Sequence, residues 1–267
     1  MSMPAPQLAY DAGSPPVIAC GLSYDDGQVD EMLQGPVKDI LQDTAGNQEL
    51  QQLLGSLVST DFEQQGLQQL LVDDTVPDNW RVGEAVAEAF VADKGNCHFP
   101  WPTGRDLKNP NASPAGCDLT GFQPADDDDL PYRFAFGEVK TSEQQQSPPS
   151  VMTSLGGQLQ GLRDNKRIKD ALCRYLGHHA ARSDWETMYK SAAKRYLQSN
   201  TNDVAVYGVL VRDIAPQSAD ISGRASALAG ACPEQTNIEI YALYLPQDTI
   251  ATLSDRAQAA IAVEGGS

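Results

Sequence analysis

The residues best suited to chemistry are Glu138 and Lys140, two apart near the end of the apolar stretch 133–142. The aromatic and small apolar residues that precede them predict a buried strand. Successive side chains of a strand point to opposite faces, so Glu138 and Lys140 are expected on one face. Charges at the end of an apolar strand are costly unless they are paired, solvated or bound to a metal. The pair therefore indicates a functional site.

A second carboxylate is expected beside this pair. Residues 116–122 predict a strand with Asp118 near its start, and the aspartate-rich loop that follows is compatible with a hairpin to the strand of Glu138. Two carboxylates brought together repel each other, and a divalent cation is the usual remedy. Asp118, Glu138 and the backbone carbonyl of Val139 would suit Mg²⁺. Lys140 would orient a metal-bound water or offset charge, which predicts phosphodiester hydrolysis.

A helix is predicted over residues 80–92, with Asp78 and Asn79 able to cap it. Its inward apolar stripe consists of Val82, Val86, Ala89 and Phe90. Glu84 and Glu88 fall on the opposite side, where they face either water or a polar site. Of the two, Glu84 is the stronger candidate for a site residue.

These motifs resemble the PD-(D/E)XK nuclease superfamily, through Glu84, Gly116-Cys-Asp118 and Gly137-Glu-Val-Lys-Thr141. More narrowly, with Trp80-Arg-Val-Gly-Glu84 included, they are similar to the nuclease subunits (HamA) of Hachiman anti-phage defence systems. The resemblance implies a restriction-endonuclease-like αβββαβ core and a Mg²⁺-dependent deoxyribonuclease, with Mn²⁺ as a substitute metal.

The same resemblance implies catalytic roles for Asp118, Glu138 and Lys140, and a metal-holding role for Glu84. It also implies a superfamily 2 helicase partner that couples DNA sensing to cleavage. Cys117 stands where the superfamily name has proline, and only the neighbouring aspartate is chemical.

Charge is unevenly distributed along the chain, whose net charge is -17. Residues 1–80 contain one basic residue and thirteen acids, whereas residues 163–195 contain nine Lys or Arg against four acids. An acidic protein that binds DNA must concentrate its phosphate contacts or share them with a partner. The candidate DNA contacts are Arg105, Lys108, Arg163, Lys166, Arg167 and Lys169.

The order of predicted elements indicates an α/β fold, a mixed sheet flanked by helices. Strands are expected at 15–24, 116–122, 133–142, 203–212 and 237–245. Helices are expected at 28–42, 47–72, 80–92, 150–176, 183–199 and 247–263. A break at 73–77 suggests two parts, an acidic accessory or partner-docking segment, residues 1–77, and the nuclease-like domain, residues 78–267.

The remaining features favour a cytoplasmic protein. The five cysteines are odd in number and contain no Cys-x-x-Cys pair, which indicates free thiols. No apolar run approaches the length of a membrane span, and no secretory signal is expected. Two alternatives to a helicase-controlled nuclease stay open: a non-catalytic acidic interaction protein on a nuclease-like scaffold, and a stand-alone restriction-type endonuclease.

Overall fold

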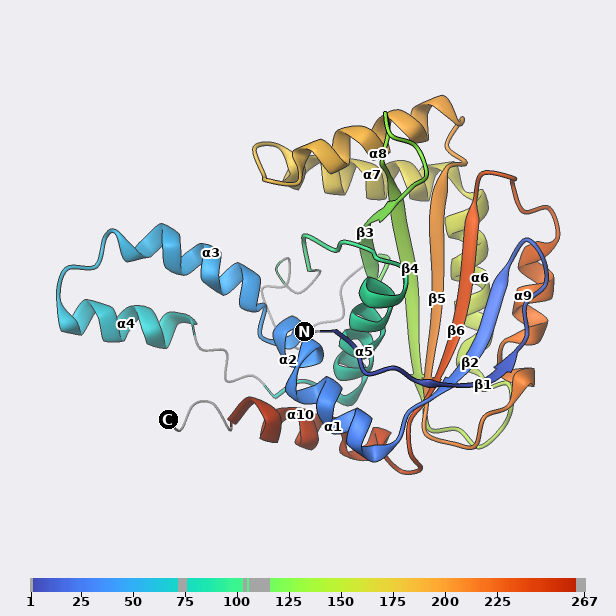
Figure 1. Ribbon diagram of the computed structural model, residues 1–267, viewed down its shortest axis with the longest axis horizontal. Coiled ribbons are helices and arrows are strands. Elements are labelled where there is room, and N and C mark those ends of the chain that lie inside the picture. The colour runs from blue at the N-terminus through green and yellow to red at the C-terminus, as the bar shows by residue number, and fades with distance from the viewer. Residues whose placement is uncertain (1, 72–75, 103–104, 106–115, 263–267) are drawn as a thin grey trace.

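The computed structural model describes residues 2–71, 76–102, 105 and 116–262. Its centre is a six-stranded mixed sheet with strand order β1-β2-β6-β5-β4-β3 (Figure 1). The strands are β1 (Gln7–Asp11), β2 (Ile18–Ser23), β3 (Leu119–Pro124), β4 (Tyr132–Ser142), β5 (Val204–Arg212) and β6 (Asn237–Tyr244). The four inner strands are parallel, and the two edge strands β1 and β3 are antiparallel to their neighbours. All nine residues of β5 are buried, as expected for a central strand rich in valine.

Helices cover both faces of this sheet. They are α1 (Asp26–Gln34), α2 (Pro36–Leu41), α3 (Thr44–Gly55), α4 (Asp61–Leu71), α5 (Asn79–Lys94), α6 (Val151–Asp164), α7 (Lys166–Ala180), α8 (Glu186–Gln198), α9 (Ser222–Ala229) and α10 (Leu253–Ala262). Helices α1, α2, α5 and α10 share one apolar core with the sheet, and α6 to α9 share the other. The α/β class with a helix-flanked mixed sheet is thereby confirmed.

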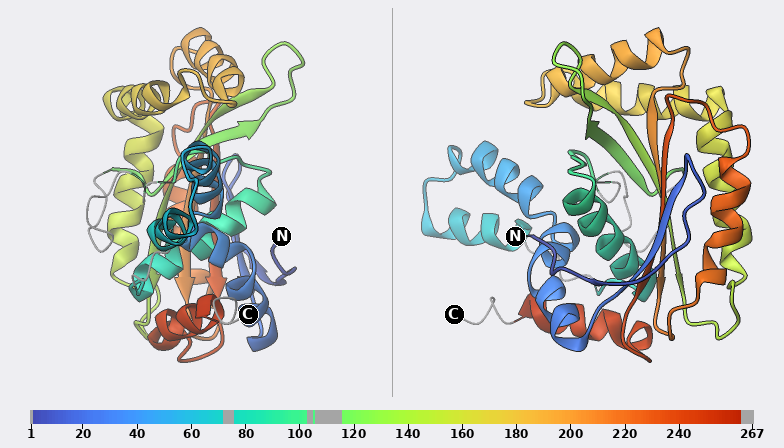
Figure 2. Two further views of the ribbon diagram at one scale, coloured as in Figure 1. Left: turned by 90° about the vertical axis from the view of Figure 1, so that its left-hand side faces the viewer. Right: turned by 45° about the vertical axis from the view of Figure 1, so that its right-hand side comes forward.

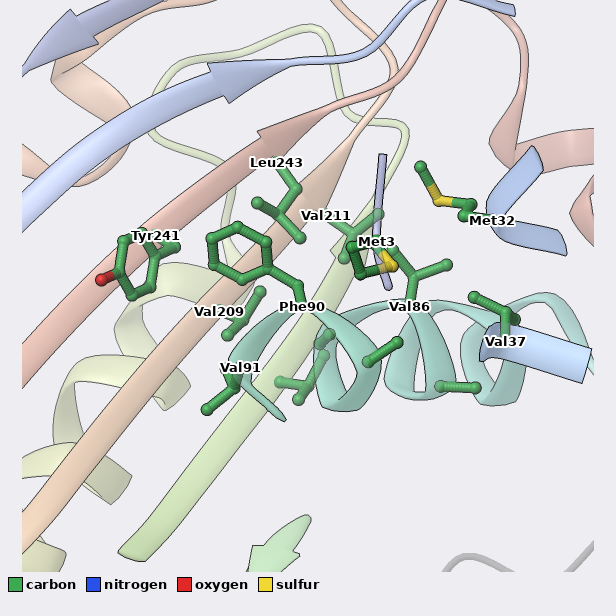
Figure 3. Close-up of a cluster of buried hydrophobic side chains, with 14 of the residues drawn as sticks. Met3, Met32, Val37, Val86, Phe90, Val91, Val209, Val211, Tyr241 and Leu243 are labelled. Carbon is green, nitrogen blue, oxygen red and sulfur yellow. The ribbon is translucent and has the colours of Figure 1, made fainter. Parts of the chain in front are cut away.

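Helix α5 is held on its face of the sheet by apolar packing (Figure 3). Phe90 lies edge-on to the ring of Tyr241 at 4.9 Å between centroids, close to Val209 and Leu243. Val86 lies one turn before Phe90 on the same side of the helix. Each fully buried side chain of this size stabilises the fold by roughly 1.5–3 kcal/mol. This packing fixes the position of the polar side of α5.

The N-terminal residues are part of the same sheet. Strand β1, absent from the predicted elements, pairs with β2, and β2 runs parallel to β6 from Ile18 to Ser23. Helix α1 packs on α10, and α2 packs on α5. The boundary expected at residue 77 therefore does not separate the sheet from an accessory segment.

The hairpin of α3 and α4 extends away from the sheet (Figures 1 and 2). It exposes large apolar side chains, among them Leu53, Leu57, Phe62 and Leu70. Leu67 alone is buried in the two helices of this hairpin. This protruding apolar hairpin lies within residues 1–77, the segment predicted to be accessory or partner-docking.

Three expected helices are broken in the structure. The helix expected at 28–42 divides at Gly35-Pro36, because proline removes a backbone donor and favours the first turn of a new helix. The helix expected at 47–72 divides between α3 and α4. The helix expected at 150–176 divides at Asn165, whose side chain caps α7 by accepting from the backbone N–H groups of Arg167 and Ile168.

No helix in the described residues is long and apolar enough to cross a membrane.

Candidate active site

The site lies where β4 extends past its edge partner. The β3–β4 pairing begins at Leu119 opposite Gly137, so residues 138–142 of β4 pair with β5 alone among the described strands. Asp118, which immediately precedes β3, occupies this open edge. Its Oδ2 accepts a 2.7 Å hydrogen bond from the backbone N–H of Val139. Because the N–H and C=O of one strand residue point to the same side, the carbonyl of Val139 also faces the open edge.

Lys140 joins the two carboxylates. Its Nζ lies 3.6 Å from Glu138 Oε2 and 3.8 Å from Asp118 Oδ2. The side chains are 22% exposed for Lys140, 13% for Asp118 and 6% for Glu138. Solvent therefore reaches the lysine end of the cluster more readily than the glutamate end. The structure brings together the three residues that the sequence predicts as the centre of the site.

Glu84 approaches this cluster from α5, and the close contact of the helix with β4 makes this possible. A Cβ on Gly83 would lie 2.1 Å from Thr141 Oγ1, so only glycine permits this approach. Glu84 Oε2 accepts a 3.2 Å hydrogen bond from Arg81, one turn earlier. Arg81 was not predicted as a site residue, although its i, i+3 spacing to Glu84 is a signal for such a pair.

The electrostatics place Glu84 at the site rather than in bulk water. Burial, and next the charge of Asp118, raise the pKa of Glu84 to about 7, against the opposing effect of Arg81. Glu88 is only 9% exposed, and burial raises its pKa to about 7 as well. The charge of Arg81 opposes this rise, and Glu88 lies among the buried residues of α5.

The buried carboxylate of Glu138 has an oxygen atom that no hydrogen bond from a described residue satisfies. Burial and the neighbouring Asp118 carboxylate raise its pKa, and Lys140 acts in the opposite direction. Its Oε2 is buried and receives no hydrogen bond within the described structure. Lys140 Nζ, 3.6 Å from this oxygen, supplies one positive charge, and a second cation would balance the two neighbouring carboxylates together.

A divalent cation fits this donor set. The described residues contain no group of three or more His, Cys, Asp or Glu side chains arranged to hold a metal. The set consists instead of two carboxylates, from Asp118 and Glu138, and the outward carbonyl of Val139. Mg²⁺ typically takes one or two protein carboxylates and fills the rest of its octahedron with water and phosphate oxygens. Glu84 would lie beside such a metal centre and is not one of these three donors.

Cys117 fixes the turn that presents Asp118. Its buried Sγ accepts from the backbone N–H of Gly137 at 3.2 Å and lies 2.9 Å from the carbonyl oxygen of Gly137. It also lies 3.1 Å from the carbonyl oxygen of Leu119. Burial raises the pKa of this thiol well above its usual value, so it stays neutral. The cysteine thus ties the start of β3 to the strand of Glu138.

The candidate DNA contacts divide into buried and exposed groups. Arg163 is 5% exposed and donates to Asp164 and to the carbonyl oxygens of Leu228 and Gly230. Lys169 is 1% exposed and donates to the carbonyl oxygen of Arg163. These two side chains serve the packing of α6 and α7, which corrects their prediction as surface cations.

The other candidates differ in their availability. Arg105 makes a bidentate ion pair with Asp43, at 2.7 and 2.8 Å, and lies over the ring of Trp101. It is therefore already neutralised. Lys166 is exposed and pairs with Asp170, and Arg167 is exposed. Lys108 lies outside the described residues.

No family model matches the chain, and no curated protein matches it either.

Proposed function

We propose that the protein is a Mg²⁺-dependent deoxyribonuclease that hydrolyses phosphodiester bonds at the cluster of Asp118, Glu138 and Lys140. The observation that carries this proposal is the lysine shared between two carboxylates at an open strand edge. One of those carboxylates has a buried oxygen without a donor. The two carboxylates can bind a divalent cation, and that cation together with the lysine can bind a negatively charged phosphate.

The order of elements supports the same class. Helix α5 is followed by an isolated antiparallel bridge between His98 and Phe122, then by β3, β4, the three helices α6, α7 and α8, and β5. This succession agrees with the αβββαβ core of restriction-endonuclease-like proteins if the bridge stands for a first strand reduced to one residue pair.

In the proposed mechanism, Asp118, Glu138 and the Val139 carbonyl would hold Mg²⁺, or Mn²⁺ as a substitute. The ion, when bound, polarises the scissile phosphate and acidifies a bound water. The positive charge of Lys140 Nζ stabilises the negative charge of the phosphate, and Nζ donates a hydrogen bond to the attacking oxygen. Glu84, with a pKa near neutrality, can accept or return a proton at the rim of the site.

The test is degradation of plasmid DNA with Mg²⁺. Glu138→Ala and Lys140→Ala should each reduce cleavage at least a hundredfold, whereas Glu143→Ala, an exposed residue just beyond β4, should not. Cleavage that is unchanged in both site variants would refute the proposal. EDTA should abolish the activity of the unmodified protein.

The resemblance to Hachiman nuclease subunits extends the proposal to cytoplasmic anti-phage defence under the control of a superfamily 2 helicase. The acidic N-terminal region and the protruding α3–α4 hairpin suit a role in complex formation. A search of the neighbouring genes for a superfamily 2 helicase, then co-purification and cleavage assays with and without it, tests that extension.

A non-catalytic interaction protein is the second candidate, and the exposed apolar side chains of Leu53, Leu57 and Phe62 favour it. Titration with Mg²⁺ separates the two. The nuclease should bind the ion in a manner that Asp118→Asn weakens, whereas a docking scaffold should show no binding that depends on Asp118.

A further inference from the structure

A groove separate from the carboxylate cluster lies between α7 and α8, which run side by side at one end of the sheet (Figures 1 and 2). Its volume is about 530 Å³. Pockets of a few hundred Å³ accommodate small ligands or single units of a polymer. The residues that line the groove indicate which kind of ligand it binds.

Aromatic rings form the base of the groove. Phe134 of β4 is fully buried, and the rings of Tyr189 and Tyr196 each lie edge-on to it at 5.8 Å between centroids. Tyr189 is half-buried and lines the groove. The hydroxyl of Tyr196 is engaged, since it donates to Asp170 at 2.8 Å. A flat apolar group that enters here meets ring surface rather than charge.

Three cations of α7 stand around this base: Lys166, Arg167 and Arg174. Asp170 neutralises Lys166 through a 2.8 Å ion pair. Arg167 and Arg174 are exposed, and neither side chain has an ion pair or hydrogen bond to another described residue. Arg174 also acts on the Asp170 carboxylate, so the three cations share this one acid of the groove and leave a surplus of positive charge that suits an anion.

The groove is also close to the candidate active site along one strand. Phe134 and Glu138 lie four residues apart on β4, and side chains at even spacing share one face. At roughly 3.3 Å per residue, the separation along the strand is about 13 Å. Residues 134–139 are buried, so a polymer that touched both places would have to pass over the surface rather than along β4.

We infer that this groove binds a nucleotide unit of single-stranded nucleic acid, with the base against Tyr189 and the phosphates at Arg167 and Arg174. A single strand is favoured over a duplex because only an unpaired base can offer its face to an aromatic side chain. The inference adds a strand-binding site to the proposed nuclease, yet binding here requires neither metal nor cleavage. A free mononucleotide offers the same chemistry, so the experiment includes both ligands.

The experiment measures fluorescence anisotropy of labelled dT12 with the unmodified chain in EDTA, where Mg²⁺-dependent cleavage cannot interfere. The double variant Arg167→Glu/Arg174→Glu should weaken binding at least tenfold. It should also lower the slope of log affinity against log salt by roughly 1.4, the value for two lost phosphate contacts on a single strand. The matched control, Arg182→Glu/Lys194→Glu, makes the same charge change outside the groove and should alter affinity less than threefold.

Two further arms test the base and the source of the ligand. An abasic strand of equal length should bind roughly tenfold more weakly than dT12, because the stacked base is missing. Competition by dTMP at concentrations near those of dT12 nucleotides would assign the groove to a free nucleotide. Photo-crosslinking of a strand that contains 5-iododeoxyuridine should map to Tyr189 or to a residue adjoining it.

Equal losses in the groove and control variants, equal binding of abasic and normal strands, or binding only to anionic phosphatidylserine vesicles would overturn the inference. Its outcome is distinguishable from that of the proposed function. Binding of dT12 through the groove without Mg²⁺-dependent cleavage would support the groove inference and refute the proposed nuclease. Mg²⁺-dependent cleavage together with an unchanged affinity for dT12 in the double variant would support the nuclease and refute the groove inference.

Discussion

The backbone N–H of Val139 donates to the carboxylate of Asp118 at 2.7 Å, and this bond joins the start of β3 to the open edge of β4. It places one carboxylate beside another that is buried, with Lys140 within 4 Å of both. The hydrogen bond also turns the Val139 carbonyl toward the same edge, because both groups belong to one strand residue. One contact thus orients two of the three proposed metal donors.

We expect Asp118→Asn to separate metal binding from folding. An amide can still accept from Val139 through its oxygen but lacks the negative charge that attracts a divalent cation. Affinity for Mg²⁺, measured by calorimetric titration, should fall at least tenfold, and cleavage should fall at least a hundredfold. The melting temperature should change little. Asp126→Asn, in the exposed loop between β3 and β4, is the control and should leave affinity and cleavage unchanged.

The contact of α5 with β4 gives a stability prediction. Gly83→Ala would place a Cβ 2.1 Å from Thr141 Oγ1, and overpacking of this kind typically costs about 1–3 kcal/mol. Urea denaturation should detect this loss. Thr141→Ala in the same chain should recover most of it by removing the opposing atoms. Gly157→Ala on α6, where a Cβ meets nothing within 4 Å, should instead stabilise by roughly 0.5–1 kcal/mol. A similar effect at both glycines would contradict the described packing.

The loop after β4 depends on a buried ion pair. Arg212 and Asp220 are fully buried, and Arg212 Nη1 lies 2.7 Å from both carboxylate oxygens. Arg212 also donates to the carbonyl oxygens of Gln144 and Gln146. Asp220→Asn should cost about 3–5 kcal/mol, because it leaves a buried guanidinium without its counter-charge.

The control for that measurement is the exposed pair of Lys166 and Asp170. Asp170→Asn should cost less than about 1 kcal/mol, since solvent screens such pairs. Thermal denaturation of both variants under identical conditions compares them directly. Comparable losses would show that burial does not govern the difference.

Buried Glu88 predicts a pH dependence of stability. Its pKa is about 7 in the folded chain against 4.5 for the ordinary side chain, so the folded state holds the proton more tightly between these values. Stability contributed by the neutral form is therefore present below pH 4.5 and is lost as the pH rises toward 7. Glu88→Gln removes this loss. The variant should match the unmodified chain near pH 4 and exceed it by about 3 kcal/mol above pH 7.

Denaturation at several pH values between 4 and 8 measures this difference. Glu143→Gln, on the exposed segment after β4, should give a difference that does not vary with pH. A flat difference for Glu88→Gln would mean that this carboxylate is ionised at no cost in the folded protein.

Local patterns in the sequence were sufficient for several elements. The β-branched run of β5 and the aromatic and small apolar residues of β4 predicted strands, and the capped apolar stripe of α5 predicted a helix close to Asn79–Lys94. The two-residue spacing of Glu138 and Lys140 placed them on one face without further information. These predictions succeeded because period and propensity are properties of neighbouring residues.

Other features were decided only by contacts between distant parts of the chain. Strands β1 and β2 join the sheet through β6, more than 200 residues later, so no local signal could assign them to it. Arg163 is an interior group because the carbonyl oxygens of Leu228 and Gly230, distant in the sequence, accept from it. Whether Glu84 faced water or the cluster depended on how closely Gly83 lets α5 approach Thr141. The sequence by itself determined the chemical groups and their spacing, whereas tertiary packing decided which of them share a buried, low-dielectric site, because burial is set by the whole chain.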